Sequence, residues 1–449
     1  MVKVSVIMPS FNVAPYIEKC LLSVRNQTLK EIEIIVVDNY STDGTREIIE
    51  KYAREDARIK LLNDEKGSCG YSNNLGIDTA TGKYIGIVET DDYIDSTMYE
   101  VLYETAEREK LDYVKSDCYE FICDAYGNEV TRNYHMMGEQ SINFYNKRIS
   151  VKEYPEILNY IRSMWASLYR KDFLVKNKIR FHESKGAAYQ DHGFLWQVAT
   201  KSNIAMYLDQ TFYHYRLDNV GCSMNNPKAL YLDWKELQFI KEYLNNNYLF
   251  CKDYRQIFYK KVYNILKMRL IQYFYHQGVC SNELENIVEC YQKELLDGID
   301  KGNFIIDFLE QKEYEDISIL LESVNTYIEH ILLKAKMFKK QIRGQLEVIK
   351  KKDNVLFGCG ENGLNLYWIL TRNSLENKIL AICDNDKKKQ GNDYLNRKVV
   401  SPEEAVERYP NANFIIANAV YYDDIKRQLL RLGVDYNRII IFEYKINEV

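Results

Sequence analysis

The chain has 449 residues, which is enough for two or three domains that each bury a core of their own. Lysine and arginine number 60 and aspartate and glutamate 65, so the formal charge of −5 gives no support to a nucleic-acid-binding protein. Apolar residues make up 46% and charged residues 28%, with 20 glycines and 6 prolines, which excludes a disordered, collagen-like or low-complexity chain.

The sequence carries no targeting signal that we recognise. It contains no run of 18 apolar residues, so no transmembrane helix is expected. A strand begins almost at the N-terminus, and no apolar segment with a small-residue cleavage site precedes it, so no signal peptide is expected. The ten cysteines are scattered and form no CxxC pair, which favours free thiols in a reducing compartment. The expected location is therefore the cytoplasm.

The first 120 residues alternate short apolar runs with amphipathic helical segments. The pattern predicts strands at 4–8, 33–37, 58–62 and 84–88, and helices at 16–27, 43–55 and 71–79. This order predicts an α/β fold with a doubly wound, mostly parallel sheet. Ligands of such sheets bind at the carboxyl ends of the strands.

The rest of the chain divides into two further regions. Residues 228–350 carry Leu, Ile, Tyr and Phe at helical spacing and are expected to be helical nearly throughout. From residue 353 the sequence returns to strand, glycine loop, helix and strand, which indicates a separate domain. The predicted division is an α/β domain at 1–224, a helical region and linker at 225–352, and a small Rossmann-like α/β domain at 353–449.

Polar segments follow three of the predicted strands, at one edge of the sheet. They are Pro9-Ser10-Phe11-Asn12, Asp38 to Thr45, and Glu89-Thr90-Asp91-Asp92. Phe11 can stack on a base, and Asp38 or Asn39 can accept a hydrogen bond from a base or a ribose. Adjacent carboxylates can hold a divalent cation that bridges two phosphates. The three segments therefore predict a site for a nucleotide diphosphate.

These segments make residues 1–100 resemble glycosyltransferase family 2, the inverting enzymes of GT-A fold that use nucleotide-sugar donors. The matching stretches are 4–12, 36–38, 41–45, 73–76, 80–85 and 90–92. Together they are specific to the family, whereas two acids after a strand would by themselves indicate only a solvated turn. The resemblance implies transfer of a sugar, from a UDP-sugar, to a hydroxyl of a glycan, lipid-linked or protein acceptor. It also implies a Mn²⁺ or Mg²⁺ cofactor.

The resemblance assigns roles to individual residues. Those implied to bind the donor are Pro9, Phe11, Asn12, Asp38, Asn39, Asn74, Asp91 and Arg216. Asp92, the last acid of the DxD-like motif, is implied to ligate the metal ion. Arg216 would offset the diphosphate charge through bidentate bonds, with a structural salt bridge as the alternative. The sequence departs from the family pattern at Asn39, Asn73, Glu89 and Gln190.

The segment Tyr189-Gln190-Asp191-His192-Gly193-Phe194 is similar to the family's ED-x-x-F motif. An inverting transferase needs one carboxylate to deprotonate the acceptor hydroxyl, and the matching residue is Asp191. Two alternatives are open: Asp191 caps a helix that begins at His192, or His192 itself is the base.

A second glycine-rich motif lies in the C-terminal region. Gly358, Gly360 and Gly363 form G-x-G-x-x-G after an apolar run, and Asp384 follows 21 residues after the last glycine. This is the spacing of the Rossmann fingerprint, in which a phosphate approaches a helix N-terminus. The expected ligand is a nucleotide, a nucleotide-sugar or NAD, or the domain binds none. The Tyr422 and Lys426 spacing of short-chain dehydrogenases is interpreted as coincidence in so short a domain.

The stretch 330–352 alternates lysines and one arginine with apolar residues. We interpret it as a solvated helix that links two domains, with peripheral contact to an anionic membrane as the alternative. Two other functional classes stay open. One is a nucleotide-sugar oxidoreductase or epimerase with its chemistry in the C-terminal domain. The other is a non-catalytic carbohydrate-binding scaffold on a decayed transferase fold, which the four departures from the family pattern would explain.

Overall fold

The computed structural model describes residues 1–138, 143–219, 221, 226, 228–248, 251–277, 280–417 and 421–442. The chain forms two compact units. The first comprises residues 1–120, 133–273 and 279–329, and the second comprises 121–132, 274–278 and 330–449. Most of the helical middle region therefore groups with the N-terminal sheet. Whether the three parts expected from the sequence fold independently stays a prediction.

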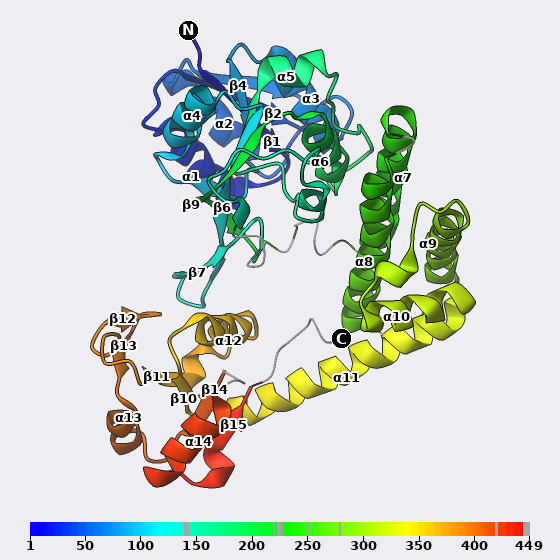
Figure 1. Cartoon of the computed structure of the whole chain (residues 1–449). Helices are drawn as coiled ribbons and strands as arrows, with labels where there is room; N and C mark the ends of the chain where they lie inside the picture. Colours follow the sequence, from blue (N-terminus) through cyan, green and yellow to red (C-terminus); the bar gives the residue numbers. More distant parts are fainter. Residues whose placement is uncertain are drawn as a thin grey trace. The chain divides into compact units, whose positions relative to one another are not determined.

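A nine-stranded sheet forms the centre of the first unit (Figure 1). Its strands are β1 (Val4–Ser10), β2 (Ile32–Asp38), β3 (Ile59–Asn63), β4 (Tyr84–Ile87), β5 (Tyr93–Ile94), β6 (Tyr113–Cys123), β7 (Glu129–Tyr134), β8 (Ser167–Arg170) and β9 (Ala205–Arg216). The order is β3-β2-β1-β4-β8-β6-β9-β5, with β7 paired to β6. Strands β1 to β4 run parallel, whereas β8 is antiparallel to both β4 and β6. The predicted α/β fold with a parallel N-terminal sheet is confirmed.

Six helices accompany these strands: α1 (Ala14–Arg25), α2 (Thr45–Glu55), α3 (Cys69–Thr79), α4 (Met98–Glu109), α5 (Lys171–Lys176) and α6 (Gln190–Lys201). Strand β2 is buried along its whole length, which explains its apolar run. Helix α3 packs tightly on β1 because Gly76 has no side chain: a Cβ there would lie 2.5 Å from the Ile7 side chain.

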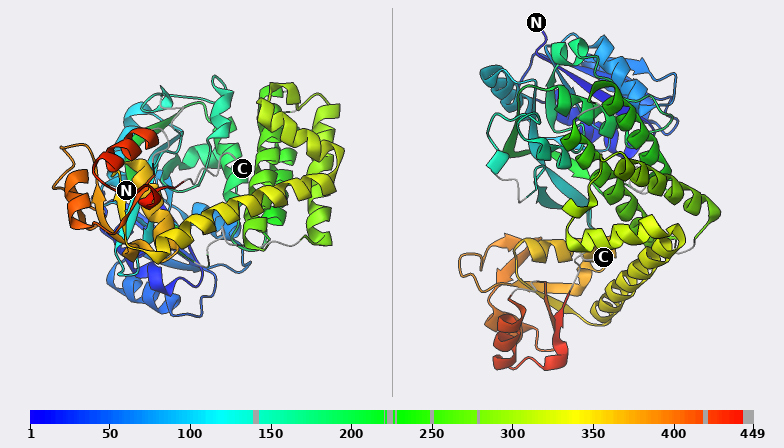
Figure 2. Two further views of the ribbon diagram at one scale, coloured as in Figure 1. Left: turned by 90° about the horizontal axis from the view of Figure 1, so that it is seen from below. Right: turned by 45° about the vertical axis from the view of Figure 1, so that its right-hand side comes forward.

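Four further helices of the first unit follow β9: α7 (Ala229–Asn247), α8 (Lys252–His276), α9 (Asn282–Asp300) and α10 (Gln311–Glu322). Helix α7 lies beside α6 (Figures 1 and 2). The close approach depends on Gly193, where a Cβ would lie 2.5 Å from the Phe239 ring. The helical region therefore packs against the helix that carries Asp191.

The second unit contains a six-stranded sheet of its own. Its strands are β10 (Asn354–Phe357), β11 (Ile379–Cys383), β12 (Asp393–Tyr394), β13 (Arg397–Val400), β14 (Asn413–Ile416) and β15 (Ile439–Ile441). The order is β12-β13-β11-β10-β14-β15, and only the β12–β13 pair is antiparallel. The five parallel strands thus follow the order 3-2-1-4-5 of doubly wound nucleotide-binding sheets. Helices α12 (Glu361–Arg372), α13 (Pro402–Arg408) and α14 (Tyr422–Arg431) connect them.

A segment from the N-terminal half of the chain also belongs to the second unit. Residues 121–132, where β6 turns into β7, contact helix α12. The Trp368 indole donates a hydrogen bond to the Val130 carbonyl oxygen (2.9 Å), and the Arg132 guanidinium lies 4.1 Å from the Trp368 ring centre. Arg132 also donates to the Asn365 side-chain oxygen at 2.7 Å. This docking of an early hairpin segment had no signal in the sequence pattern.

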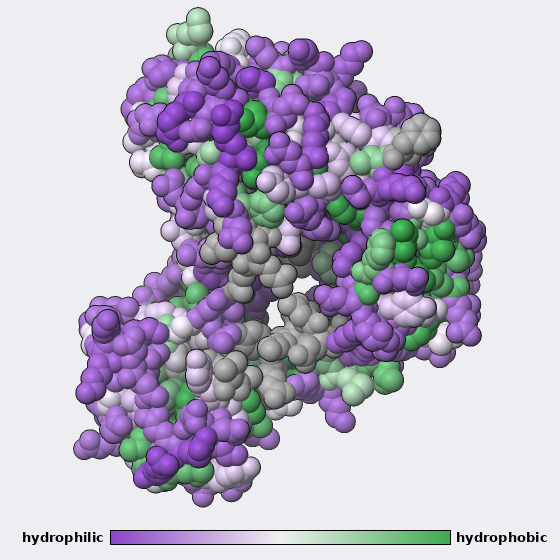
Figure 3. All heavy atoms as spheres, viewed as in Figure 1, coloured by the Kyte–Doolittle hydropathy of each residue, from purple (hydrophilic) through white to green (hydrophobic). Residues whose placement is uncertain are grey.

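Helix α11 (Val324–Lys351) is continuous and runs from residues of the first unit into residues of the second. It carries the basic stretch and exposes Leu333, Met337 and Val348. Within the described residues, no helix has the length and apolar character needed to cross a bilayer. Hydrophilic side chains dominate the face drawn in Figure 3, with an apolar cluster in the part that carries α9 and α10.

Candidate active site

The predicted acidic site forms where β4 ends. Glu89, Asp91 and Asp92 each place a carboxylate oxygen within 4.8 Å of the other two. Burial and the charges of Asp91 and Asp191 raise the pKa of Glu89 to about 8, against a hydrogen bond from the Trp165 side chain that lowers it. Burial and the charges of Asp91 and Glu89 raise the pKa of Asp92 as well. Three crowded carboxylates repel one another, and hard oxygen ligands of this kind suit Mg²⁺ or Mn²⁺. The residues therefore fit a divalent cation.

Asp92 is the most deeply buried of the three, with 1% of its surface exposed. One carboxylate oxygen accepts a hydrogen bond from the Tyr213 hydroxyl and the other from the Arg216 backbone N–H, each at 2.7 Å. Asp92 thus ties the acidic loop to β9. Its predicted role as a metal ligand stays a prediction, now alongside a structural role that the sequence did not indicate.

Arg216 is held by protein groups on three sides. Its Nε donates to the Asp91 carbonyl oxygen (3.0 Å), and its guanidinium pairs with Asp218 (3.0 Å) and lies 4.6 Å from the Tyr16 ring centre. Both interpretations of this arginine retain support: the structure shows the salt bridge, and the side chain lies next to the acids expected to meet a diphosphate.

The residues expected to bind the base and ribose lie at the ends of β1 and β2. Phe11 is exposed to 54%, which leaves its ring open for stacking. Asp38 is fully buried, and its carboxylate accepts from the Ser41 hydroxyl (2.6 Å) and from Arg46 (3.2 Å). Asn12 accepts from the Thr42 backbone N–H at 2.9 Å and so joins the two loops. Asp38 and Asn12 thus hold the two loops beside the exposed Phe11 ring through hydrogen bonds within the protein.

The remaining residues expected to bind the donor differ in exposure: Pro9 and Asn39 are partly exposed, whereas Asn74 is buried. Asn39 donates its backbone N–H to the Ser10 carbonyl oxygen (2.9 Å) and, like Pro9, is partly exposed at the strand ends. Asn74 is buried and uses its whole amide inside the protein, with bonds to both backbone groups of Phe181 and to Glu183. Asn74 therefore positions the segment before α6, a role different from the predicted donor contact, which stays a prediction.

Asp191 and Glu89 line the same cleft, which has a volume of about 740 Å³. Helix α6 begins at Gln190, with Tyr189 as the residue before it and no side-chain cap bond. The alternative that Asp191 caps a helix beginning at His192 is therefore wrong. Asp191 lies in the first helical turn and is partly exposed.

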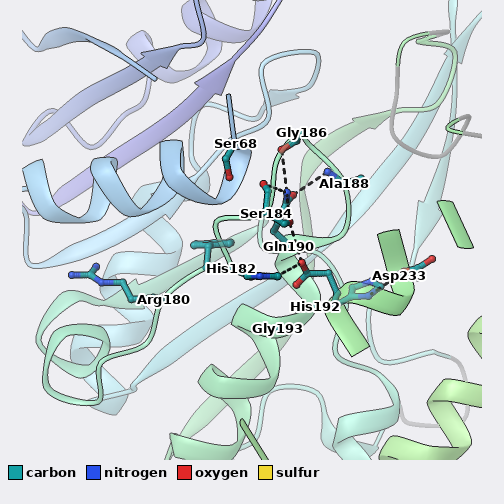
Figure 4. Close-up of polar contacts among 12 residues, drawn as sticks. Ser68, Arg180, His182, Ser184, Gly186, Ala188, Gln190, His192, Gly193 and Asp233 are labelled. Atoms are coloured by element: carbon teal, nitrogen blue, oxygen red, sulfur yellow. Dashed lines mark hydrogen bonds and ion pairs between the residues drawn. The ribbon is translucent and has the colours of Figure 1, made fainter. Parts of the chain in front are cut away.

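Gln190, which stands where the family pattern has Glu, fastens the loop before α6 (Figure 4). Its amide nitrogen donates to the carbonyl oxygens of Ser184 (3.1 Å) and Gly186 (3.0 Å), and its oxygen accepts from the Ala188 N–H (2.9 Å). A carboxylate could not donate the first two bonds. This departure from the family pattern thus has a structural reason.

Helix α7 contributes two buried carboxylates that face the histidines around α6 (Figure 4). Glu236 lies 2.6 Å from His182 Nδ1, and Asp233 lies 3.6 Å from His192 Nδ1. Asp233 also accepts a 2.6 Å bond from the buried Arg269 of α8. The Glu236 carboxylate raises the pKa of His182, and burial raises the pKa of Asp233. His192 Nδ1 lies near this buried acid but beyond hydrogen-bond distance, so the alternative that His192 is the base stays a prediction.

The helical region and residues 160–165 form part of the cleft wall, which the sequence did not predict. Helix α8 lines the cleft with Lys260, Lys261, Asn264, Ile265, Met268 and Arg269. Beneath the 163–167 segment, the buried Lys115 donates to Ser163 O, Trp165 O and Ser167 Oγ at 2.6–3.1 Å. Burial lowers the pKa of Lys115 to about 7. One signal was available: Asp233 and Glu236 are three residues apart on an apolar helix face, and buried acids require partners.

The C-terminal glycine loop lines a second cleft of about 430 Å³ in the second unit. Gly358 has φ +103°, and a Cβ at Gly363 would overlap the Gly358 carbonyl oxygen, whereas a Cβ at Gly360 would meet no atom within 4 Å. Asp384 closes the loop: its carboxylate accepts from the backbone N–H groups of Cys359 (2.9 Å) and Asp386 (2.8 Å). The four predicted residues are thus brought together, while their ligand stays a prediction.

Known sequences match both halves of the chain. The sequence model of Glycosyl transferase family 2 matches residues 5–175, and that of C2185-like, N-terminal, matches residues 350–440. The uncharacterized glycosyltransferase EpsJ of Bacillus subtilis is 33% identical over 233 residues, which cover 51% of this chain and 62% of EpsJ. The chain thus spans less than two thirds of that relative. The GalNAc(5)-diNAcBac-PP-undecaprenol beta-1,3-glucosyltransferase of Campylobacter jejuni is 30% identical over 249 residues, 54% of this chain and 75% of the relative.

The fold has solved counterparts. The structure of Staphylococcus aureus TarS 1–349 in complex with UDP has a TM-score of 0.56 and 20% identity, covering 76% of this chain and 92% of that chain. At this identity the likeness concerns the fold.

The parallel sheet and the match to the family model place the chain in one class of protein, the glycosyltransferases. The chain belongs to glycosyltransferase family 2. It is accordingly a glycosyltransferase that uses a nucleotide-sugar donor.

Proposed function

We propose that the chain transfers a sugar from a UDP-sugar to an acceptor hydroxyl with inversion, in one metal-assisted displacement. The observation that carries the proposal is the joint cleft: Glu89 of the acid cluster and Asp191 of α6 line one 740 Å³ space. A donor whose diphosphate lies at the acid cluster would place its anomeric carbon toward Asp191. The acceptor is a glycan, lipid-linked or protein hydroxyl, and the setting is the cytoplasm, with peripheral membrane contact of α11 as the alternative to its interpretation as a solvated linking helix.

In the displacement, the acceptor oxygen forms a bond to the anomeric carbon while the bond from that carbon to the diphosphate breaks. The acceptor proton passes to an Asp191 carboxylate oxygen, and the nucleoside diphosphate leaves. A Mn²⁺ or Mg²⁺ ion held by Glu89, Asp91 and Asp92 would neutralise the leaving group. The Trp165 side chain fixes Glu89, and Asp92 fixes the acidic loop to β9.

The base must be ionised at working pH. Asp191 lies in a first helical turn beside the Lys261 side chain. His192, whose Nδ1 lies 3.6 Å from Asp233, is the second candidate.

The test is a panel of nucleotide sugars, with and without Mn²⁺, in which thermal stabilisation and release of the nucleoside diphosphate are measured together. A donor that binds should stabilise the protein by mass action. The proposal predicts stabilisation by UDP-sugars and Mn²⁺-dependent release of UDP. Binding without release from any donor would favour the non-catalytic scaffold.

For the second unit, we propose a nucleotide-containing ligand in the 430 Å³ cleft. The 3-2-1-4-5 strand order and the open space above Gly360 support it. Calorimetric titration of the full chain with UDP-sugars and with NAD tests it: NAD binding would favour the oxidoreductase class, and a nucleotide-sugar would favour a second donor site. A titration in which neither ligand binds outside the first unit would contradict the proposal.

A further inference from the structure

The wall of the active-site cleft carries four cationic side chains from the parts of the chain that have no family motif. Arg162 lies in the segment before β8, and Lys260, Lys261 and Arg269 lie on α8. Asp191 lines the same cleft. The cations therefore lie where the acceptor must approach the base.

Two of these four cations are neutralised within the protein. Lys260 pairs with Glu313 at 3.0 Å, and Arg269 pairs with the buried Asp233 at 2.6 Å. These pairs are structural, and neither requires a ligand.

The other two cations have only uncharged partners. Lys261 Nζ donates to the Ile161 carbonyl oxygen at 3.4 Å, and Arg162 donates to the Tyr134 hydroxyl. Neither forms an ion pair with a carboxylate within 4.0 Å in the described part of the chain. They are also close to each other, since the carbonyl that Lys261 contacts belongs to the residue before Arg162. Burial and then the positive charge of Arg162 lower the pKa of Lys261 to about 8.

Lys261 is partly buried and Arg162 is exposed, and neither is paired with a carboxylate. A partly buried ammonium beside a second positive charge is unfavourable in the free protein. An oxyanion bound between them removes this repulsion. A guanidinium accepts phosphate or carboxylate oxygens in a bidentate fork, and an ammonium adds a point charge.

We propose that the acceptor carries an oxyanion, a phosphate or a carboxylate, which binds between Arg162 and Lys261 while the hydroxyl that receives the sugar lies at Asp191. This inference rests on the proposed function, since it takes Asp191 as the base. It makes Arg162 and Lys261 determinants of acceptor specificity. The donor diphosphate is assigned elsewhere, to the acid cluster at the end of β4.

The experiment uses the full chain and three small probes: glycerol 3-phosphate, glucuronate and glycerol. Binding is measured by calorimetry for the wild type, Lys261→Met, Arg162→Met and the matched control Lys260→Met, whose lysine is adjacent on α8 and already paired. UDP affinity with Mn²⁺ is measured for the same four proteins.

We expect one or both anions to bind the wild type and glycerol not to bind; the anion that binds tells phosphate from carboxylate. Affinity for that anion should fall at least 10-fold in Lys261→Met and Arg162→Met and change less than 3-fold in Lys260→Met. UDP affinity should be unchanged throughout. The melting temperature of free Lys261→Met should equal or exceed that of the wild type, because one of two repelling charges is gone.

Wild-type protein that binds neither anion overturns the inference. So does a 10-fold loss of UDP affinity in Lys261→Met or Arg162→Met, which would assign the two cations to the donor diphosphate. Neither readout involves turnover. Failure of the proposed function would instead be seen as absent UDP release with anion binding intact.

Discussion

Asp233 of α7 and Arg269 of α8 form a buried ion pair beside the candidate active-site cleft. Arg269 is 4% exposed and Asp233 fully buried, with 2.6 Å between Arg269 Nε and the carboxylate. Arg269→Met removes the cation and leaves an acid whose nearest remaining ionisable neighbour is the His192 ring, at 3.6 Å. Breaking a buried pair from one side costs about 3–5 kcal/mol.

The pH dependence of the unfolding free energy gives a second, independent value for the loss of stability. With Arg269 gone, Asp233 is expected to take up a proton in the folded state, whereas the unfolded carboxyl has a pKa of about 3.9. Keeping it neutral then costs about 4 kcal/mol at pH 7 and about 1.5 kcal/mol at pH 5. The sign follows because the folded variant holds a proton that the unfolded chain has lost, so its stability falls as pH rises above 3.9.

The assay is urea unfolding at pH 5 and pH 7, followed by tryptophan fluorescence, for the wild type, Arg269→Met and the double variant Arg269→Met/Asp233→Asn. The double variant has no buried charge and should recover most of the loss at pH 7. An Arg269→Met protein within about 1 kcal/mol of the wild type at pH 7 would refute the reasoning, since it would mean that the pair is hydrated.

Three further comparisons of variants test the acid cluster, the buried lysine and the C-terminal glycine loop. Asp91→Asn should weaken Mn²⁺-dependent UDP binding without lowering the melting temperature. Asp92→Asn should lower both the UDP affinity and the melting temperature, because it also alters the contacts to Tyr213 and Arg216. Equal melting temperatures for the two variants would contradict the structural role of Asp92. The free energy of unfolding of the wild type should rise relative to that of Lys115→Met between pH 7 and pH 10. The Lys115 pKa of about 7 in the folded protein lies below its unfolded value, so the unfolded chain binds one more proton in this range. A difference in unfolding free energy that does not change with pH would show that Lys115 is hydrated. Gly360→Val should leave the second unit folded and abolish ligand binding there, whereas Gly363→Ala should destabilise it through overlap with the Gly358 carbonyl; calorimetry and thermal unfolding separate the two effects, and a Gly360→Val protein that still binds ligand would remove the loop from the site.

The N-terminal fold and the acid cluster could be predicted from the sequence because both depend on local patterns. Apolar strands with polar ends fix the sheet edge, and parallel strands bring Pro9, Asp38 and Glu89 to it. The role of Gln190 could not be predicted, since its partners are backbone groups of a loop that has no periodicity. The contribution of α8 was also hidden: Lys261 resembles any helical surface lysine until the packing of α7 on α6, which Gly193 permits, brings the helical region to the cleft.

Docking of residues 121–132 on α12 shows a second limit. The Trp368 to Val130 hydrogen bond joins residues 238 positions apart, and neither residue belongs to a motif. The docking joins a segment of the N-terminal half to α12 by pairwise contacts that no local pattern encodes.

The central claim is that Asp191 is the base of a metal-assisted sugar transfer. Its most direct test is the rate of UDP release by the wild type and by Asp191→Asn, with UDP affinity measured by calorimetry in parallel. The account predicts Mn²⁺-dependent release by the wild type and a rate about 10²–10⁴-fold lower for Asp191→Asn, with UDP affinity unchanged, because an amide cannot accept the acceptor proton and does not contact the diphosphate. Near-normal release by Asp191→Asn, or loss of its UDP binding, would contradict the account.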